Sequence, residues 1–275
     1  MAETQKRGMQ DKLIGILVLA LLVAVGGLGY MYGQLKVLGS VKNTTGSDTT
    51  AAGQQQAAAQ PQVSVTDDQI KALFSDKDLV TFGDANRKML FVEVSDPSCP
   101  YCHIAGGEDP ELNKQAGANF VMAVDGGSYV PPVPEMRRLV DAGKASFAFV
   151  YYPGHGNGEL ATKAMFCAQD EGKFWQAHDK LMSDAGYGLI NDKVKNDIAN
   201  AQQLVDFLSD VTNAGQMKSC LESDKYADRL QANMAVASKL GVSGTPGFFV
   251  NTIPFSGAYS YADMKAAVEK VLGES

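Results

Sequence analysis

The sequence predicts an α/β domain whose sheet is interrupted by an inserted helical subdomain, the whole preceded by a transmembrane helix. Two apolar runs rich in β-forming residues, 88–94 and 145–152, flank a helical pattern, and two short strands and a helix close the chain. Between the run at 145–152 and the two short strands, residues 159–241 show repeated helical spacing and almost no strand signal. An apolar segment of 19 residues, Leu13 to Met31, is long enough to cross a hydrocarbon core of about 30 Å.

The residues around the apolar segment predict its orientation. Three basic residues precede it, Lys6, Arg7 and Lys12, and they favour an N-terminus that stays in the cytoplasm. A cleaved signal peptide is the alternative, but its apolar region usually has only about 7–15 residues and ends at a small-residue cleavage site. We therefore expect residues 1–12 in the cytoplasm, 13–32 as a single-pass anchor in the lipid bilayer of the cell membrane, and the rest of the chain outside the cytoplasm.

Composition divides the remaining chain into a linker and a globular part. Residues 33–64 are mostly Gly, Ser, Thr, Ala and Gln, and such a segment buries too little apolar surface to offset its ordering entropy, so we expect a flexible linker. The globular domain then spans residues 65–275. From Gly33 onward, 21 Lys and Arg stand against 29 Asp and Glu. A net charge of −8 argues against a nucleic-acid partner.

The elements of the domain follow in order. Thr66 and Gln69 form a capping-box pattern that predicts a short first helix. The strand at 88–94 is apolar except for Glu93, a helix is expected at 135–143, and Pro153 ends the strand at 145–152.

The second half of the chain predicts the insertion and the return to the sheet. We expect four or five helices in an insertion covering about 155–241, within which Phe174, Trp175 and His178 are more typical of a core than of a site. The short strands 248–250 and 253–255 and an amphipathic helix at 261–272 then complete the sheet.

One motif carries the chemistry, S-D-P-S-C-P-Y-C-H at residues 95–103. A C-x-x-C-H sequence fits a redox dithiol, a c-type haem attachment or half of a zinc site. Small haem-c domains are usually helical, whereas predicted strands bracket this motif. Zinc needs two more ligands, and the candidates, Cys167 and Cys220, lie in the helical region without a second close pair. The redox dithiol is therefore favoured.

Two further features support the dithiol. Glu93 lies six residues before Cys99 in an apolar strand, and a buried carboxylate there is placed to exchange a proton with a thiol. The alternative is a glutamate on an edge strand facing water. Pro246 leads directly into a strand, where an X-Pro bond can be cis, the alternative being an ordinary trans turn.

The chain resembles the DsbA-like thiol:disulfide oxidoreductases of the thioredoxin superfamily, which carry a helical domain inserted into the thioredoxin fold. The resemblance covers roughly residues 65–273. The residues that carry it are FVEVSD at 91–96, CPYC at 99–102, EGKFW at 171–175 with His178 and Leu181, and GVSGTPGFFVN at 241–251. The resemblance implies that Glu93 is a buried proton acceptor and that Pro246 is cis and packs beside the dithiol.

The resemblance also implies roles for the residues of the motif. Cys99, at a helix N-terminus, is expected to be the attacking thiolate, and Cys102 the resolving cysteine. Four residues are expected to line the substrate site, Pro100, Tyr101, His103 and Thr245. The only redox group needed is the Cys99–Cys102 disulfide, with no other cofactor and no metal.

The other two cysteines and one insertion complete the prediction. The preferred connectivity pairs Cys167 with Cys220 as a structural disulfide, the alternative being two buried free thiols. Residues 108–133 interrupt the helix expected after His103 and look like an insertion beside the active site, either a lid or partner loop or a neutral surface excursion.

Together these features predict a membrane-anchored, extracytoplasmic thiol:disulfide oxidoreductase that mainly oxidises cysteine-containing secreted or membrane polypeptides. A membrane protein of the quinone-linked DsbB or vitamin-K-epoxide-reductase type is expected to recycle it. The alternatives are a reductase or isomerase of the same fold, a non-catalytic binding module, and a haem-c electron-transfer protein.

Overall fold

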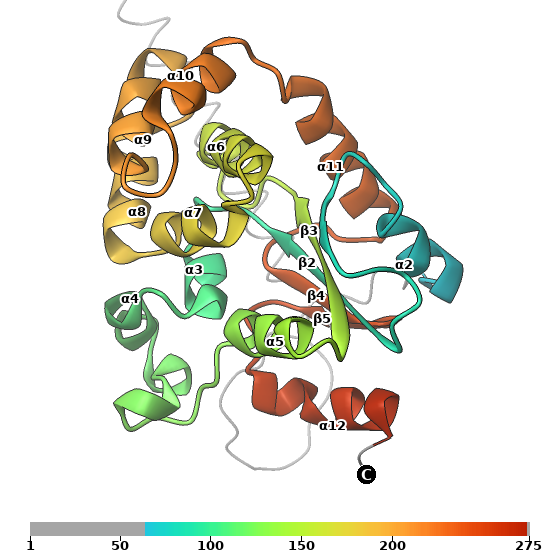
Figure 1. Cartoon of the computed structure of the whole chain (residues 1–275). Helices are drawn as coiled ribbons and strands as arrows, with labels where there is room; N and C mark the ends of the chain where they lie inside the picture. The colour runs from blue at the N-terminus through green and yellow to red at the C-terminus, as the bar shows by residue number, and fades with distance from the viewer. Residues whose placement is uncertain (1–63, 274–275) are drawn as a thin grey trace, which may run out of the picture. The chain divides into compact units, whose positions relative to one another are not determined.

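A five-stranded mixed sheet forms the centre of the domain (Figure 1). A computed structural model of the chain describes residues 64–273. The predicted membrane anchor and all of the predicted linker except Ser64 lie outside the described residues. Within 64–273, no helix is long and apolar enough to cross a membrane.

The strand order is β1-β3-β2-β4-β5, so β2 lies in the middle of the sheet. Strand β2 pairs in parallel with β3 and antiparallel with β4, while β1 and β5 form the two edges. The strands are β1 (Val80–Phe82), β2 (Met89–Ser95), β3 (Ala145–Tyr151), β4 (Gly247–Val250) and β5 (Ile253–Ser256). Every residue of β2, β3 and β4 is buried, which accounts for their continuous apolar sequences.

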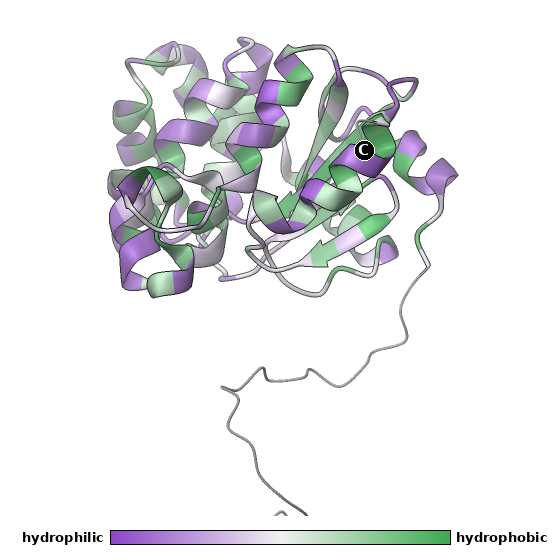
Figure 2. Cartoon of the chain, turned by 90° about the horizontal axis from the view of Figure 1, so that it is seen from below, coloured by the Kyte–Doolittle hydropathy of each residue, from purple (hydrophilic) through white to green (hydrophobic). Residues whose placement is uncertain are grey.

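Helices cover both faces of the sheet. Leu90, Val92 and Val94 of β2 face one core, which also contains Ile70 of α2 (Asp67–Leu73) and Ala237 of α11 (Ala227–Lys239). The alternate residues of β2 face the other core, beneath α5 (Pro132–Asp141), α6 (Glu159–Asp170), α7 (Phe174–Leu181) and α12 (Tyr261–Leu272). Apolar residues are concentrated on the strands, and polar residues on the outer faces of the helices (Figure 2).

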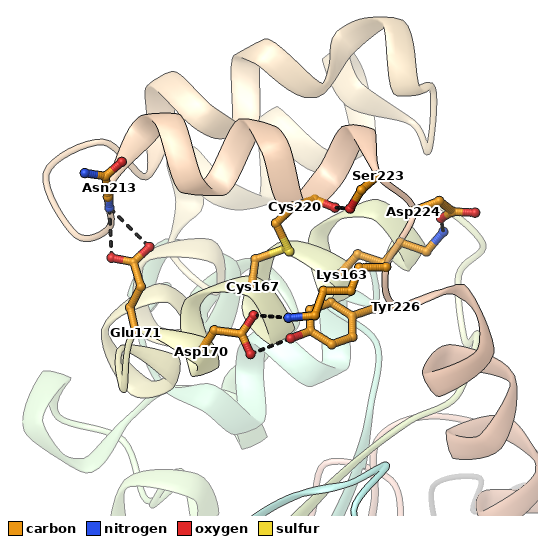
Figure 3. The surroundings of a disulfide bond; sticks show 10 residues. Lys163, Cys167, Asp170, Glu171, Asn213, Cys220, Ser223, Asp224 and Tyr226 are labelled. Atoms are coloured by element: carbon orange, nitrogen blue, oxygen red, sulfur yellow. Dashed lines mark hydrogen bonds and ion pairs between the residues drawn. A yellow bond between two sulfur atoms is a disulfide. The ribbon is translucent and has the colours of Figure 1, made fainter.

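The insertion between β3 and β4 is helical, as the sequence predicts, but it contains six α-helices rather than four or five. Besides α6, α7 and α11 it contains α8 (Asp184–Gly188), a π-helical turn (Leu189–Val194), a 3₁₀ turn (Ile198–Asn200), α9 (Ala201–Phe207) and α10 (Ala214–Glu222). A disulfide joins Cys167 on α6 to Cys220 on α10, so the structure contains the preferred pairing (Figure 3). The two helices pack against each other around it.

The segment after the motif is a set of short turns beside α3 (Pro100–Gly106). It contains α4 (Pro110–Gln115) and two 3₁₀ turns, Ala118–Phe120 and Ala123–Asp125. The ring of Phe120 contacts that of Tyr101 at 5.7 Å between centroids. The insertion predicted at 108–133 therefore packs against the active-site helix.

Candidate active site

The two cysteines of the motif lie where the central strand meets a helix. After β2 ends, a short loop leads to Cys99, which is the N-cap residue of α3, and Pro100 occupies the first helical turn, where its missing N–H is not needed. Both cysteines are free thiols. Cys99 is 5% exposed and Cys102 is 0% exposed, so Cys99 is the more accessible sulfur.

The surroundings of Cys99 favour its thiolate. A hydrogen bond from the Cys102 thiol is the largest effect that lowers the pKa of Cys99, and the Thr245 side chain and the backbone N–H groups of Cys102 and Tyr101 act in the same direction. Burial opposes them, and the result is a pKa of about 6, against 9.0 for an ordinary thiol. At neutral pH this sulfur is therefore mainly a thiolate, the form that attacks disulfides.

Cys102 is held in the opposite state. Burial raises its pKa well above the ordinary value, and the neighbouring Cys99 sulfur raises it further. The backbone N–H of Asp96 points at Cys102 Sγ from 3.4 Å. One accessible thiolate next to one buried thiol is the arrangement that an attacking and a resolving cysteine require.

Thr245 and Pro246 lie across from Cys99. The peptide bond between them is cis, as the sequence resemblance implies. Cys99 Sγ is 3.4 Å from the main-chain oxygen of Thr245, to which the protonated thiol donates. Gly154 fits closely against the Thr245 side chain, because a Cβ at position 154 would lie 1.7 Å from Thr245 Oγ1.

Glu93 lies on the central strand and is completely buried. The alternative interpretation, a glutamate on an edge strand facing water, is therefore wrong. Its in-register neighbours are Phe149 on β3 and Phe248 on β4, and neither of its carboxylate oxygens has a hydrogen-bond partner within the described residues. Burial raises the pKa of Glu93, so this acid is readily protonated.

Asp96 organises the loop, a role that the sequence alone did not indicate. One carboxylate oxygen accepts hydrogen bonds from the N–H and the hydroxyl of Ser98, and the other accepts from the N–H groups of Gly154 and His155, all at 2.7–2.8 Å. The side chain is fully buried. Asp96 thus joins the cysteine loop to the segment that contacts Thr245. The sequence does place an acid directly after a buried strand. Its partners Gly154 and His155, however, are 58 and 59 residues further along the chain, so the sequence pattern does not reveal them.

His103 bridges two main-chain carbonyls rather than facing a ligand site. Its ring nitrogens lie 2.7 Å from the oxygen of Met182 and 2.8 Å from that of Pro97. Burial lowers the pKa of His103. An axial haem ligand would have to give up one of these contacts, which disfavours the haem interpretation. The zinc interpretation loses its further ligands because Cys167 and Cys220 are joined to each other.

Fold and site together define a class of protein. The sheet has this strand order, a C-x-x-C motif begins a helix, a cis-proline loop lies opposite the motif, and a buried acid lies on the central strand. This combination is that of a thioredoxin-like thiol:disulfide oxidoreductase.

Comparisons with known proteins agree with this class. A family model described as Thioredoxin matches residues 134–270. "Putative protein-disulfide oxidoreductase" of Rickettsia bellii is 24% identical over 229 residues, 82% of this chain and 76% of that protein. "Disulfide bond formation protein D" of Bacillus subtilis is 21% identical over 198 residues, 69% and 75% of the two chains. The solved structure of α-DsbA1 from Wolbachia pipientis matches with a TM-score of 0.55 at 17% identity, covering 75% of this chain and 96% of that one. The chain is thus similar to DsbA-like oxidoreductases of the thioredoxin superfamily.

Proposed function

We propose that this oxidoreductase is anchored in the cell membrane with its catalytic domain outside the cytoplasm, and that it introduces disulfides into secreted or membrane polypeptides. The observation that carries the oxidising direction is the pKa of about 6 for Cys99. A stabilised thiolate favours the reduced form of the enzyme, and an enzyme whose reduced form is stabilised is a strong oxidant.

The proposed reaction begins with the oxidised enzyme. A substrate thiolate attacks Cys99, the Cys99–Cys102 bond breaks, and Cys102 leaves as a thiolate. Because the pKa of Cys102 is raised, that thiolate takes up a proton, and we assign its donor as the protonated Glu93. A second substrate thiolate then attacks the substrate sulfur of the mixed disulfide, so the substrate gains a disulfide and Cys99 leaves as a thiolate. The two electrons lost by the substrate reside in the enzyme dithiol.

The substrate is proposed to bind as an extended segment beside Thr245. A cleft of about 760 Å³ adjoins this loop and is lined by residues 240–249, 252 and 254–257, together with Ser64 and Val65. The edge strand β5 contributes to it. A cleft lined by main chain at a sheet edge suits recognition through backbone hydrogen bonds, which supports a broad range of substrates.

The location is supported by the sequence before the domain and by the disulfide. Leu13 to Met31 has the length and apolarity of a membrane span. The Cys167–Cys220 disulfide fits an oxidising compartment. Reoxidation then requires an acceptor of two electrons in the membrane, which we assign to a quinone-linked protein of the DsbB or vitamin-K-epoxide-reductase type.

The reduction potential of the Cys99–Cys102 pair tests the proposal. The full chain in detergent is equilibrated in glutathione buffers, alkylated and read by mass. A potential between about −120 and −180 mV supports an oxidase, whereas a value near −270 mV indicates a reductase and contradicts the proposed direction. A chain that stays in the soluble fraction of its host cells would contradict the anchor.

A further inference from the structure

Three buried polar side chains on one side of the central strand have atoms without a hydrogen-bond partner within the described residues. They are both oxygens of Glu93, the hydroxyl of Ser95 and Nε2 of His178. All three residues are at most 1% exposed. Buried polar atoms are normally paired, and unpaired ones are concentrated where they serve a chemical role. These atoms therefore need an explanation.

Aromatic contacts connect the strand position of Glu93 to His178 on α7. Phe149 on β3 is the in-register neighbour of Glu93, and its ring contacts Phe174 of α7 at 5.4 Å between centroids. Phe174 in turn stacks on His178, one turn further along α7, at 5.9 Å. Glu93 and His178 are close enough for a significant electrostatic interaction, in which the imidazole favours the carboxylate.

The C-terminal end of α7 lies beside the two cysteines. Met182, which follows α7 and lies one turn beyond His178, packs against Cys99 and Cys102. Ser95 lies two residues after Glu93 on the same face of β2, and the N–H of the next residue, Asp96, is 3.4 Å from Cys102 Sγ. A series of polar groups therefore extends from Cys102 through Ser95 and Glu93 to His178.

The series reaches the surface on the other side of His178. Its Nδ1 is 3.0 Å from Asp179 Oδ1, and the other oxygen of Asp179 accepts a hydrogen bond of 2.8 Å from Arg137 on α5. Asp179 is 34% exposed and lines a surface pocket of about 230 Å³ together with Glu108 and Arg137. The charged or titratable groups that act on His178 from the elements around it are Glu93, His103, Glu108, Arg137 and Asp179.

We propose that His178 is a proton-relay residue that acts through Glu93, carrying protons between the buried active site and the surface pocket at Asp179. The proposal rests on the function proposed above. When Glu93 gives its proton to the Cys102 thiolate, it becomes a carboxylate. His178, once protonated, donates a proton to that carboxylate through a bridging water molecule, and His178 takes a new proton from solvent at the pocket. In the reverse step, Cys102 gives its proton to Glu93, and His178 carries it outward. No electrons move in the relay.

A single-turnover experiment on the full chain tests the relay. Reduced enzyme is mixed with oxidised glutathione, quenched by acid at set times and read by mass, which gives the rate at which Cys102 resolves the Cys99–glutathione mixed disulfide at each pH. His178→Gln removes a group that favours the Glu93 carboxylate, so the pKa of Glu93 rises. We expect the pH-rate profile to move to higher pH, with resolution slowed on the order of tenfold at neutral pH.

Two controls separate a relay from a structural role. His155→Gln makes the same chemical change at an exposed imidazole and should leave the profile unchanged. The pKa of Cys99 in His178→Gln should stay at about 6, because its causes do not include His178. If His178→Gln fails to fold, Asp179→Asn at the half-buried next residue should move the profile in the same direction.

The outcomes distinguish this proposal from the proposed function. An unchanged profile in folded His178→Gln, or in Asp179→Asn where it replaces that variant, overturns the relay. If Glu93→Gln also keeps the wild-type profile, the assignment of Glu93 as the proton donor fails. If wild-type enzyme forms no mixed disulfide, the oxidoreductase function itself fails.

Discussion

The sulfur of Cys99 lies 3.4 Å from the main-chain oxygen of Thr245, although the two residues are 146 positions apart in the chain. This contact joins the cysteine loop to the cis-proline loop. Gly154 lies close to the side chain of Thr245, and the gap between them is too small for a side chain at position 154. The position of Thr245 beside Cys99 therefore depends on the absence of a side chain at Gly154.

Gly154→Ala should disturb Cys99 through Thr245. The new Cβ would meet Thr245 Oγ1 at 1.7 Å and Thr245 Cβ at 2.9 Å, so Thr245 must move. Because the Thr245 side chain helps to lower the pKa of Cys99, that pKa should rise above about 6. Thiolate absorbance at 240 nm measures it. Gly244→Ala is the control, since a Cβ there meets nothing within 4 Å. Equal pKa values in the two variants would contradict the prediction.

The stability of the reduced enzyme should depend on pH between about 6 and 9. Cys99 has a folded-state pKa of about 6 and an ordinary value of 9.0, so its contribution is fully present above pH 9 and is lost as the pH falls through 6. The raised pKa of Cys102 acts only above pH 9. The free energy of unfolding of the reduced form, relative to the oxidised form, should rise by about 3 kcal/mol across this range.

Urea denaturation of both redox forms at several pH values measures this difference. The oxidised form serves as the reference for all other titrating groups. Reduced Cys99→Ser should lose the pH dependence, because its hydroxyl does not ionise in this range. A difference between the two redox forms that stays constant from pH 6 to 9 would show that the Cys99 thiolate is not stabilised by the fold.

Asp96→Asn should destabilise the domain and loosen the loop. The buried carboxylate accepts four hydrogen bonds, and an amide would turn its NH₂ group toward donors of Ser98 or of Gly154 and His155. We expect a loss of about 2–4 kcal/mol in the free energy of unfolding, measured with urea. Asp206→Asn, at an exposed position on α9, should change it by less than about 0.5 kcal/mol. A loss at Asp96 no larger than at Asp206 would refute the role given to this carboxylate.

The sequence predicts best what depends on neighbouring residues. Long apolar runs indicated β2 and β3 to within a residue, and the Thr66 capping box is formed as expected. Strand β1 was missed because its three residues carry no period and are stabilised by pairing with Phe147 to Phe149. The partners of Asp96 and the effect of His178 on Glu93 were also missed, since both arise from contacts between distant segments. His178 has the helical spacing of a core residue and is buried like one, so the pattern along α7 did not distinguish it from the apolar residues around it.

The Cys167–Cys220 disulfide should stabilise the insertion without affecting the active site. It closes a loop of 53 residues between α6 and α10, and the chain-entropy model gives a stabilisation of about 4 kcal/mol for that length. Cys167→Ala and Cys220→Ala should each lower the free energy of unfolding by about this amount, because each opens the same loop. The nearby polar contacts, such as that of Asp170 with Tyr226 (Figure 3), remain in both variants. Cys167 is more buried than Cys220, so a much larger loss in Cys167→Ala would indicate a cavity effect instead. The pKa of Cys99 should stay at about 6 in both, since its causes lie in Cys102, Thr245 and the adjacent backbone.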